Sequence, residues 1–170
     1  MELTQAIKKR RSIRKFKRDS IPYESIREAL EAAMHAPSAG NLQSCYFYVV
    51  SDQTLRKRLA AAAYDQNFIK QAPVVVVVCT DHRIQTTYGE RGITLYAIMD
   101  CAAAIQNMLL CAYSLGLGSC WVGAFHEQEV TKLLNIPLHL RPVSIVPLGY
   151  PNESPAPPPK MPFENACEFL

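Results

Sequence analysis

Hydrophobic and polar positions along the chain follow two periods, one typical of helices and one typical of strands. The segment YESIREALEAAMHA, residues 23–36, has apolar residues at helical spacing after a proline, and Pro37 ends it. The same kind of pattern predicts further helices over residues 3–9, 52–64, 93–114 and 126–135. The helix at 52–64 begins on Asp52, which is a favourable residue for a helix start.

Runs of β-branched and aromatic residues predict the strands. CYFYVVS, residues 45–51, is the first, and PVVVVVCT, residues 73–80, is a continuous apolar run typical of a central strand covered on both faces. Two shorter strands are predicted over residues 118–124 and 143–150. Residues 81–92 are polar and are predicted to connect a strand to the long helix. Strands and helices mix without strict βαβ alternation, which predicts an α+β, three-layer αβα arrangement.

The end of the chain departs from this plan. Five prolines between Pro151 and Pro159 cannot join a helix or a central strand. We therefore expect one domain over residues 1–150 and an extended proline-rich arm over residues 151–170, which is suited to packing on a neighbouring subunit.

Composition narrows the class of protein. A chain of 170 residues suits one compact domain, and a net charge of +3 is weak support for a polyanionic partner. The six cysteines lack C-x-x-C spacing and lie mostly in apolar runs, so we expect reduced, buried thiols in a cytoplasmic protein. The start of the chain does not resemble a secretory signal. The apolar run 93–113 is long enough for a bilayer, but Asp100 and two amides favour a buried helix of a soluble protein.

The segment KKRRSIRKFKR, residues 8–18 and hereafter the basic segment, carries eight positive charges in eleven residues. Ile13 and Phe16 are spaced like buried anchors. Arg10, Arg11, Ser12 and Arg14 combine guanidinium groups with a hydroxyl at the end of a short helix, which suits a phosphate. A solvated basic face is the alternative, and nucleic-acid binding lacks the interleaved aromatic residues that such a surface uses.

Two loops offer groups for a flat ring. In GLGSCWVGAF the glycines fail the dinucleotide-binding spacing, because its third glycine falls at Trp121; a helix end at Gly116 followed by a strand is the simpler interpretation. Glycines beside Trp121 also allow a ring to approach the backbone. In APSAGNLQ, Asn41 and Gln43 offer amides that can read a heterocycle. The four histidines show no metal-binding spacing, and no hydrolase or P-loop motif occurs.

In their order along the chain, these segments resemble the FMN-dependent nitroreductase family. The resemblance is carried by AIKKRRSIRKFK, APSAGNLQSCYFYVV, FIKQAPVVVVV, RPVSIVPLGYP and the long YGERGITLYAIMDCAAAIQNMLLCAYSLGLGSCWVGAF. The R-R-S-I-R-x-[FY] opening, the P-S-x-x-N-x-Q loop and G-L-G-S-C-W-[VI]-G are specific when they occur together. The resemblance implies a mostly antiparallel central sheet and an interlocked homodimer with FMN at its interface.

The resemblance also assigns roles to matching residues. Arg10, Arg11 and Ser12 would hold the FMN phosphate, and Arg14 would reach the pyrimidine edge of the flavin near N1 and O2. Lys160 in the arm would add a phosphate contact, although Met161 follows where family members often carry a second basic residue. The remaining cofactor-binding residues line the ring: Pro37, Ser38 and Ala39 from the neighbouring subunit, the amides of Asn41 and Gln43, and the segment Cys120, Trp121, Val122 and Gly123 beside N5.

The activity implied is that of an FMN-dependent oxidoreductase. NAD(P)H, as a transient reductant, would pass hydride to flavin N5 and leave, and a small oxidant such as a nitroaromatic or a quinone would then take the electrons, in a ping-pong cycle. No side chain is predicted to act as an acid or base, and Arg14 is predicted to stabilise the charge of the reduced ring. No metal, nucleic acid or membrane is implied.

Other functions remain open at this point. A flavin-binding or regulatory module without turnover would share the same residues. Flavin-fragmenting and dehalogenating relatives use large lid segments, for which residues 81–92 look too short. A nucleic-acid binder has only the basic segment in its favour.

Overall fold

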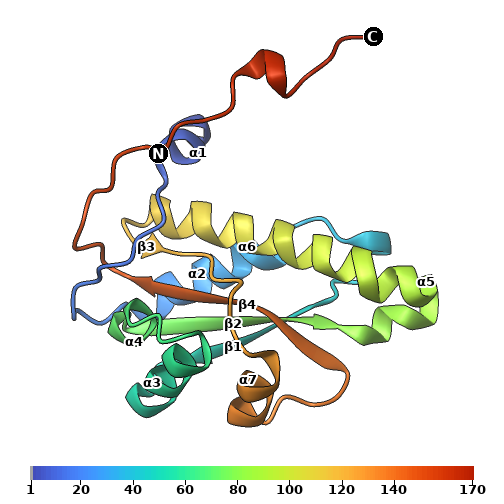
Figure 1. The fold of residues 1–170 in the computed structure, drawn as a ribbon, viewed down its shortest axis with the longest axis horizontal. Coiled ribbons are helices and arrows are strands. Elements are labelled where there is room, and N and C mark those ends of the chain that lie inside the picture. Colours follow the sequence, from blue (N-terminus) through green and yellow to red (C-terminus); the bar gives the residue numbers. More distant parts are fainter. Residues whose placement is uncertain (1) are drawn as a thin grey trace.

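A computed structural model describes residues 2–170 of the chain. Its centre is one four-stranded antiparallel sheet in the order β1-β2-β4-β3 (Figure 1). The strands are β1, Cys45–Val50; β2, Val74–Asp81; β3, Gly118–Ser119; and β4, Leu140–Gly149. The valine run predicted to be a central strand is β2, which pairs with β1 on one side and β4 on the other.

The alternation of side chains along β2 divides the core into two halves. Val75 and Val77 face one buried cluster, and Val74, Val76 and Val78 face the other. Both clusters are closed to solvent because every residue from Val74 to Thr80 is buried. A register shift between Val78 and Cys79 lies opposite Pro142, which has no N–H to donate to the ladder.

Helices cover both faces of this sheet, as Figure 1 shows. Helices α2, Tyr23–Met34, and α6, Ala97–Ser114, pack on the face of Val76. Helices α3, Gln53–Ala62, α4, Phe68–Gln71, and α7, Glu127–Leu134, pack on the face of Val77. The three-layer αβα prediction is confirmed. Helix α4 was not predicted, because four residues are too few to show a period.

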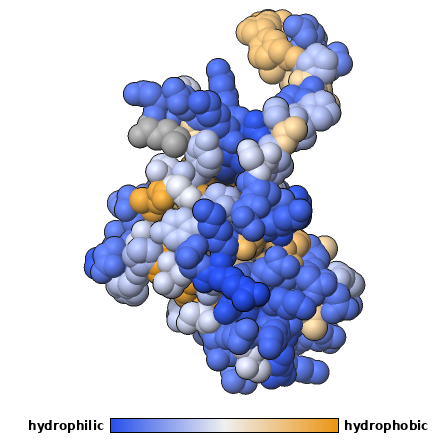
Figure 2. All heavy atoms as spheres, turned by 90° about the vertical axis from the view of Figure 1, so that its left-hand side faces the viewer, coloured by the Kyte–Doolittle hydropathy of each residue, from blue (hydrophilic) through white to orange (hydrophobic). Residues whose placement is uncertain are grey.

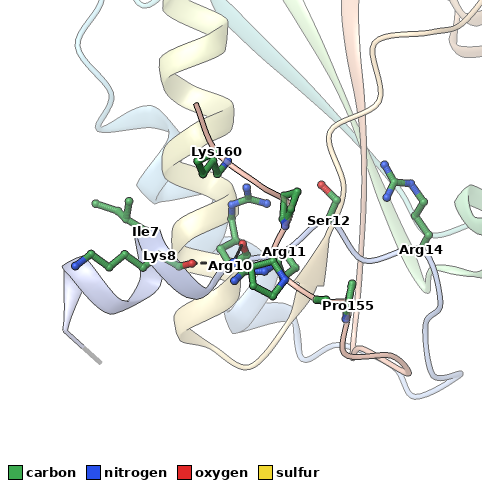
Figure 3. A pocket seen from close by; sticks show the side chains of 11 residues that line it. Ile7, Lys8, Arg10, Arg11, Ser12, Arg14, Pro155 and Lys160 are labelled. Atoms are coloured by element: carbon green, nitrogen blue, oxygen red, sulfur yellow. Dashed lines mark hydrogen bonds between the residues drawn. The ribbon is translucent and has the colours of Figure 1, made fainter. Parts of the chain in front are cut away.

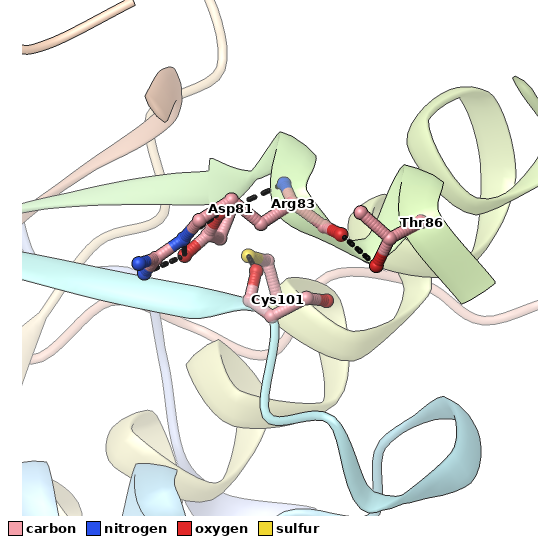
Figure 4. Close-up of polar contacts among 5 residues, drawn as sticks. Asp81, Arg83, Thr86 and Cys101 are labelled. Carbon is pink, nitrogen blue, oxygen red and sulfur yellow. Dashed lines mark hydrogen bonds and ion pairs between the residues drawn. The ribbon is translucent and has the colours of Figure 1, made fainter. Parts of the chain in front are cut away.

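Residues 81–92 connect β2 to α6 as predicted, but the helical turns that they form were not predicted. The chain turns there through η2, His82–Ile84, and α5, Gln85–Arg91, and a π-helical turn, η3, Gly92–Tyr96, leads into α6. Asp81 starts this run, because its carboxylate accepts from the Arg83 N–H at 2.9 Å and pairs with the Arg83 guanidinium (Figure 4). Hydrogen bonds from the Arg83 side chain and backbone N–H, together with the positive charge of Arg83, lower the pKa of the Asp81 carboxyl.

The helical stretch His82–Ser114 is long and apolar enough to cross a membrane, a test that core helices of soluble proteins also meet. One face of it is in the core, where Cys101, Ile105 and Met108 are buried. The opposite face exposes Ile98 and Met99, so a single chain leaves part of this helix without a partner. Helix α6 then ends at the predicted glycine. Gly116 has φ of 76°, its N–H donates to Tyr113, and the Leu117 N–H donates to Ala112.

The strand predicted over residues 118–124 is reduced to the two residues of β3. Val122 adds an isolated bridge to Ile145 on β4. The other residues of the segment, 120, 121, 123 and 124, pair with no strand. The edge of β4 is therefore only partly covered. This leaves the segment that follows β3 free to serve the site.

Both ends of the chain leave the sheet on the same side (Figure 1). Helix α1, Leu3–Lys9, lies beside the arm, residues 151–170, whose only helical turn is η4, Phe163–Asn165. The arm is exposed from Ser154 onward, and its last residues include the exposed Phe163 and Phe169. Figure 2 shows this side of the molecule as mainly hydrophilic, with a hydrophobic end to the projecting arm.

All six cysteines are free thiols, but the expectation that they are all buried is wrong. Cys79, Cys101 and Cys120 are buried, two others are half-buried, and Cys167 is exposed in the arm. Burial raises the pKa of Cys79 to about 12. The thiolate is the reactive form of cysteine. The buried thiols are therefore protected in two ways: reagents cannot reach them, and they remain protonated.

We expect iodoacetamide at pH 8 to alkylate Cys167 first in the folded protein. Cys79 and Cys101 should react only after denaturation, because their burial excludes the reagent and the pKa of each thiol is raised, that of Cys79 by burial and that of Cys101 by its hydrogen bond with Cys45 and by burial. Peptide mass mapping of native and urea-treated samples gives the measurement. Labelling of Cys79 at the rate of Cys167 in the folded protein would contradict the packing described above.

Candidate functional site

The basic segment is fastened to the end of the sheet by its two apolar residues. Ile13 and Phe16 are each 7% exposed, as the spacing predicted. The Ile13 N–H donates to the Ser119 carbonyl of β3 at 2.9 Å, and the Lys17 N–H donates to Tyr150 at 2.9 Å. The backbone between these bonds is therefore held in place while its charged side chains stay outside.

Two glycines make room for these anchors. A Cβ at Gly118 would lie 2.8 Å from Cγ1 of Ile13, and a Cβ at Gly149 would lie 2.9 Å from Cδ1 of Phe16. Contacts this short require displacement of the neighbouring atoms. The glycine of β3 thus serves the close packing of the basic segment rather than a dinucleotide-binding turn.

The charged side chains border an open pocket of about 680 Å³ between α1, the basic segment and the arm (Figure 3). Ser12 lies between the Arg10–Arg11 pair and Arg14, and Lys160 reaches the same pocket from the arm. Arg11 also donates through Nη1 to the Lys8 carbonyl at 2.7 Å, which satisfies an acceptor at the end of α1. The structure therefore brings together all five residues predicted to hold the phosphate and the pyrimidine edge.

The positive charge of this pocket is not neutralised within the chain. In residues 2–170 the ion pairs are Arg27–Glu31, Arg83–Asp81 and Arg141–Glu127, all of them elsewhere. Glu153 is the carboxylate near the pocket, and it accepts from the backbone N–H groups of Arg14 and Lys15, the latter at 3.0 Å. Glu153 therefore fixes the backbone and leaves the guanidinium groups available to an anion. Sequence reasoning missed this residue, which has no motif around it.

The segment from Cys120 to Gly123 lies against the same part of the basic segment. Cys120 is buried, which raises the pKa of its thiol, while Arg14 and Ser12 close by act to lower that pKa. Trp121 is 42% exposed, and Val122 is buried through its bridge to β4. A Cβ at Gly123 would meet no atom of residues 2–170 within 4 Å. The structure places this segment next to Arg14, and its contact with a ligand stays a prediction.

The loop 37–43 lies at the opposite end of the sheet. The Asp81 N–H at the end of β2 donates to Ser44 beside this loop, whereas the basic segment adjoins β3 and β4 at the start of β2. The eight-residue strand β2 separates the two groups by about 23 Å, at roughly 3.3 Å per residue step. Pro37, Ser38, Ala39, Asn41 and Gln43 are therefore not brought to the basic pocket of the same chain.

This loop has an unusual backbone. Gly40, Asn41 and Gln43 have φ values of 57°, 55° and 51°, in the left-handed region. For a residue with a side chain this conformation costs roughly 1–2 kcal/mol. Ser38 supports it, because its Oγ accepts from the Gln43 N–H at 3.0 Å. Gly40 also admits Tyr88 of α5, whose hydroxyl would lie 2.5 Å from an added Cβ.

A buried carboxylate on α6 holds both ends of this turn. Asp100 accepts from the Ala39 N–H at 2.9 Å and from the Ser44 hydroxyl at 2.6 Å. Sequence reasoning noted Asp100 only as an obstacle to a membrane-spanning helix. The signal for its role was present, since a lone acidic residue in an apolar helix requires a polar partner.

The fold is of the α+β class, and its basic pocket is lined by groups that suit an anion. Residues 2–170 contain no group of three or more histidine, cysteine or acidic side chains placed to hold a metal ion. The groups that converge on the pocket are guanidinium, ammonium and hydroxyl groups, and all of them can donate to phosphate oxygens.

Comparison with known proteins identifies the family. A sequence model of the nitroreductase family matches residues 7–69 and 60–150. An NADH dehydrogenase from Thermus thermophilus is 34% identical, and the match covers 97% of this chain and 94% of that one. An FMN reductase [NAD(P)H] from Bacillus subtilis is 29% identical, over 96% of this chain and 71% of that one.

A solved structure extends the likeness to the whole fold. The NADPH:FMN oxidoreductase from Vibrio harveyi, complexed with NAD⁺, superposes with a TM-score of 0.91 at 28% identity, over 98% of this chain and 76% of that one. The present chain belongs to the nitroreductase family, as the resemblance of its motifs predicted.

The packing of Ile13 against Gly118 predicts different effects for two glycine substitutions. Gly118→Ala should lower the free energy of unfolding by about 1–3 kcal/mol, because the added methyl group overlaps Ile13. Gly123→Ala is the matched control and should change it by no more than about 0.5 kcal/mol. Urea unfolding followed by circular dichroism measures both, and equal losses in the two variants would contradict the proposed packing.

Proposed function

We propose that the protein is an FMN-dependent NAD(P)H oxidoreductase that acts on a small oxidant. The observation that carries this proposal is the pocket in which Arg10, Arg11, Ser12 and Lys160 converge without an acidic partner. The names of the relatives from Bacillus subtilis and Vibrio harveyi support the choice of flavin and of pyridine nucleotide. No separate dinucleotide-binding turn is required, which agrees with the failed glycine spacing.

The residues of the pocket suit the phosphate of FMN. Arg10 and Lys160 supply positive charge, Ser12 supplies a hydroxyl donor, and Arg11 retains donors beyond the one that contacts Lys8. An anion that is always present in such a pocket offsets the mutual repulsion of these cations. The basic segment and the arm, distant in sequence, would therefore be joined by the ligand.

Arg14 is suited to the pyrimidine edge of the flavin. It stands apart from the Arg10–Arg11 pair, next to Cys120, and its guanidinium lies 5.9 Å from the centre of the Phe68 ring. A fixed cation beside N1 and O2 stabilises the negative charge of the reduced ring. The exposed Trp121 and the side-chain-free Gly123 leave the adjoining backbone open to a flat ligand.

The second half of the site is proposed to come from another copy of the chain. Loop 37–43 and the basic segment lie at opposite ends of β2, so two chains related by a twofold axis, with the loop of each facing the basic segment of the other, would complete two equivalent sites. The apolar residues Ile98 and Met99 on α6 supply a surface for such a dimer, and the exposed arm can cross to the partner.

FMN, held by these residues, would supply the redox chemistry between NAD(P)H and a nitroaromatic, a quinone or a similar oxidant, in a ping-pong cycle. The chain itself orients the ring and supplies fixed charge; no side chain is assigned as an acid or base. We place this soluble enzyme in the cytoplasm, in keeping with its free thiols.

The proposal predicts a yellow protein. Purified protein, or apo-protein given FMN, should bind one flavin per chain, and NAD(P)H should bleach the flavin absorbance under anaerobic conditions. Addition of a quinone should restore the colour. A protein that refuses FMN would rule out the proposal, and one that binds FMN without reduction by either nucleotide would leave a flavin-binding module in its place.

Replacement of Arg14 should change the redox potential. Arg14→Gln removes the fixed cation and keeps much of the side-chain length, so we expect the two-electron midpoint potential of bound FMN to fall by about 30 mV, on the basis of about 1.5 kcal/mol for a hydrogen bond to a charged group. Spectroelectrochemical titration measures this shift. Lys57→Gln, in the exposed part of α3, is the control and should leave the potential unchanged. An unaltered potential with FMN fully bound would overturn the role of Arg14.

A further inference from the structure

Asp100 is unusual among the buried residues of the chain. Of the buried side chains in residues 2–170, it alone carries a full charge, and only 6% of it is exposed. It lies on α6, where the buried residues on either side of it, Ala97 and Cys101, are apolar. Burial of a carboxylate is unfavourable unless hydrogen bonds or a cation compensate, and an apolar residue would serve the packing of α6 better.

The compensation comes entirely from one turn of the chain. One carboxylate oxygen accepts from the Ala39 N–H and the other from the Ser44 hydroxyl, and no ion pair of residues 2–170 involves Asp100. These two donors stand at the beginning and end of the same loop. Asp100 therefore links both ends of the loop to α6 through its two carboxylate oxygens, and we call this pair of hydrogen bonds the Asp100 clamp.

The loop between these donors has a strained backbone. Asn41 and Gln43 adopt left-handed backbone angles that are unfavourable for residues with side chains. Strained backbone of this kind persists only where the surroundings enforce it, and it is concentrated at functional sites. The hydrogen bond from Gln43 to Ser38 closes the turn internally, and Asp100 attaches it to the long helix.

A small cavity of about 130 Å³ lies beside this clamp and is lined by Pro37, Ser38, Gln43 and Asp100. Residues predicted to line the flavin ring thus share one surface with the carboxylate. A shift of the Asp100 side chain would be transmitted to them directly, without the involvement of the basic pocket.

We propose that Asp100 is a positioning residue for FMN, one that fixes loop 37–43 in the conformation presented to the flavin of the partner subunit. This inference rests on the proposed function. Asp100 contacts neither the flavin nor the substrate, and it acts through Ala39 and Ser44. The unfavourable burial of its charge is then explained by the site and not by the stability of the fold.

The first test uses Asp100→Asn, which keeps the shape of the side chain but replaces one acceptor oxygen with an NH₂ group. We expect the dissociation constant for FMN, measured by quenching of flavin fluorescence with apo-protein, to rise about tenfold. Ser44→Ala removes one of the two donors and should raise it about threefold. Should Asp100→Asn fail to fold, Ser44→Ala retains the test.

The matched control is Asn107→Ala on the same helix. Its amide donates to the Ala32 carbonyl of α2 at 3.2 Å and has no contact with the loop. It should lower the melting temperature of the apo-protein and leave the FMN dissociation constant unchanged. If wild-type protein binds FMN and Asp100→Asn and Ser44→Ala bind it equally well, the positioning role is refuted while the proposed function stands. If wild-type protein binds no FMN, both are refuted.

A mixed dimer tests whether the clamp acts across the interface. One chain carries Asp100→Asn and the other carries Arg10→Ala, with different affinity tags for purification. One site of this dimer then combines an intact basic pocket with an intact loop, and the other site contains both defects. We expect one FMN per mixed dimer to bind with wild-type affinity, whereas each altered homodimer binds weakly at both sites. Weak binding at both sites of the mixed dimer would overturn the proposal.

Discussion

The position of the basic segment depends on the absence of two side chains. Gly118 and Gly149 leave the space into which Ile13 and Phe16 pack, and the Ile13 N–H bond to Ser119 fixes the register of the segment against β3. Without this close approach the guanidinium groups of residues 10–14 would be attached to a flexible end of the chain. With it, they acquire the rigidity of the sheet, and a rigid charge stabilises an anion without the entropy loss of ordering it.

The contacts of the basic segment also explain how its positive charges remain available to an anion. Glu153 directs its carboxylate to the backbone N–H groups of Arg14 and Lys15 and so tethers the arm while leaving the guanidinium groups unpaired. A bound anion would relieve the electrostatic repulsion among these cations. The arrangement brings both ends of the sequence to one pocket. The Asn152 N–H donates to the Lys15 carbonyl and anchors the arm three residues after the sheet ends, and Lys160 further along the arm lines the pocket.

Much of the fold was predictable because its signals are local or periodic. The valines of β2, the Asp52 helix start and the Gly116 helix end each have a direct physical cause in the sequence. The helical turns before α6 were not predictable from their polarity, because the Asp81 cap starts them and a π-helical turn joins them to α6. The convergence of Arg14 with Cys120 was expected from the family resemblance. The apolar helix around Asp100 signals that this residue needs a polar partner, but one sequence does not show which distant groups Asp100 and Glu153 contact.

The division of the predicted site between the two ends of β2 has a further consequence. One end holds a cluster of unpaired cations on a rigid support, and the other holds a strained loop clamped by a buried carboxylate. The charge on Asp100 lies far from the basic pocket of its own chain, so within one chain it does little to neutralise that pocket. In a twofold dimer the two ends would meet, and the amides of the loop, which are neutral, would face the ring while the cations face the phosphate. Separation within the chain therefore allows each end to be stabilised by its own local contacts, independently of any ligand that would join them.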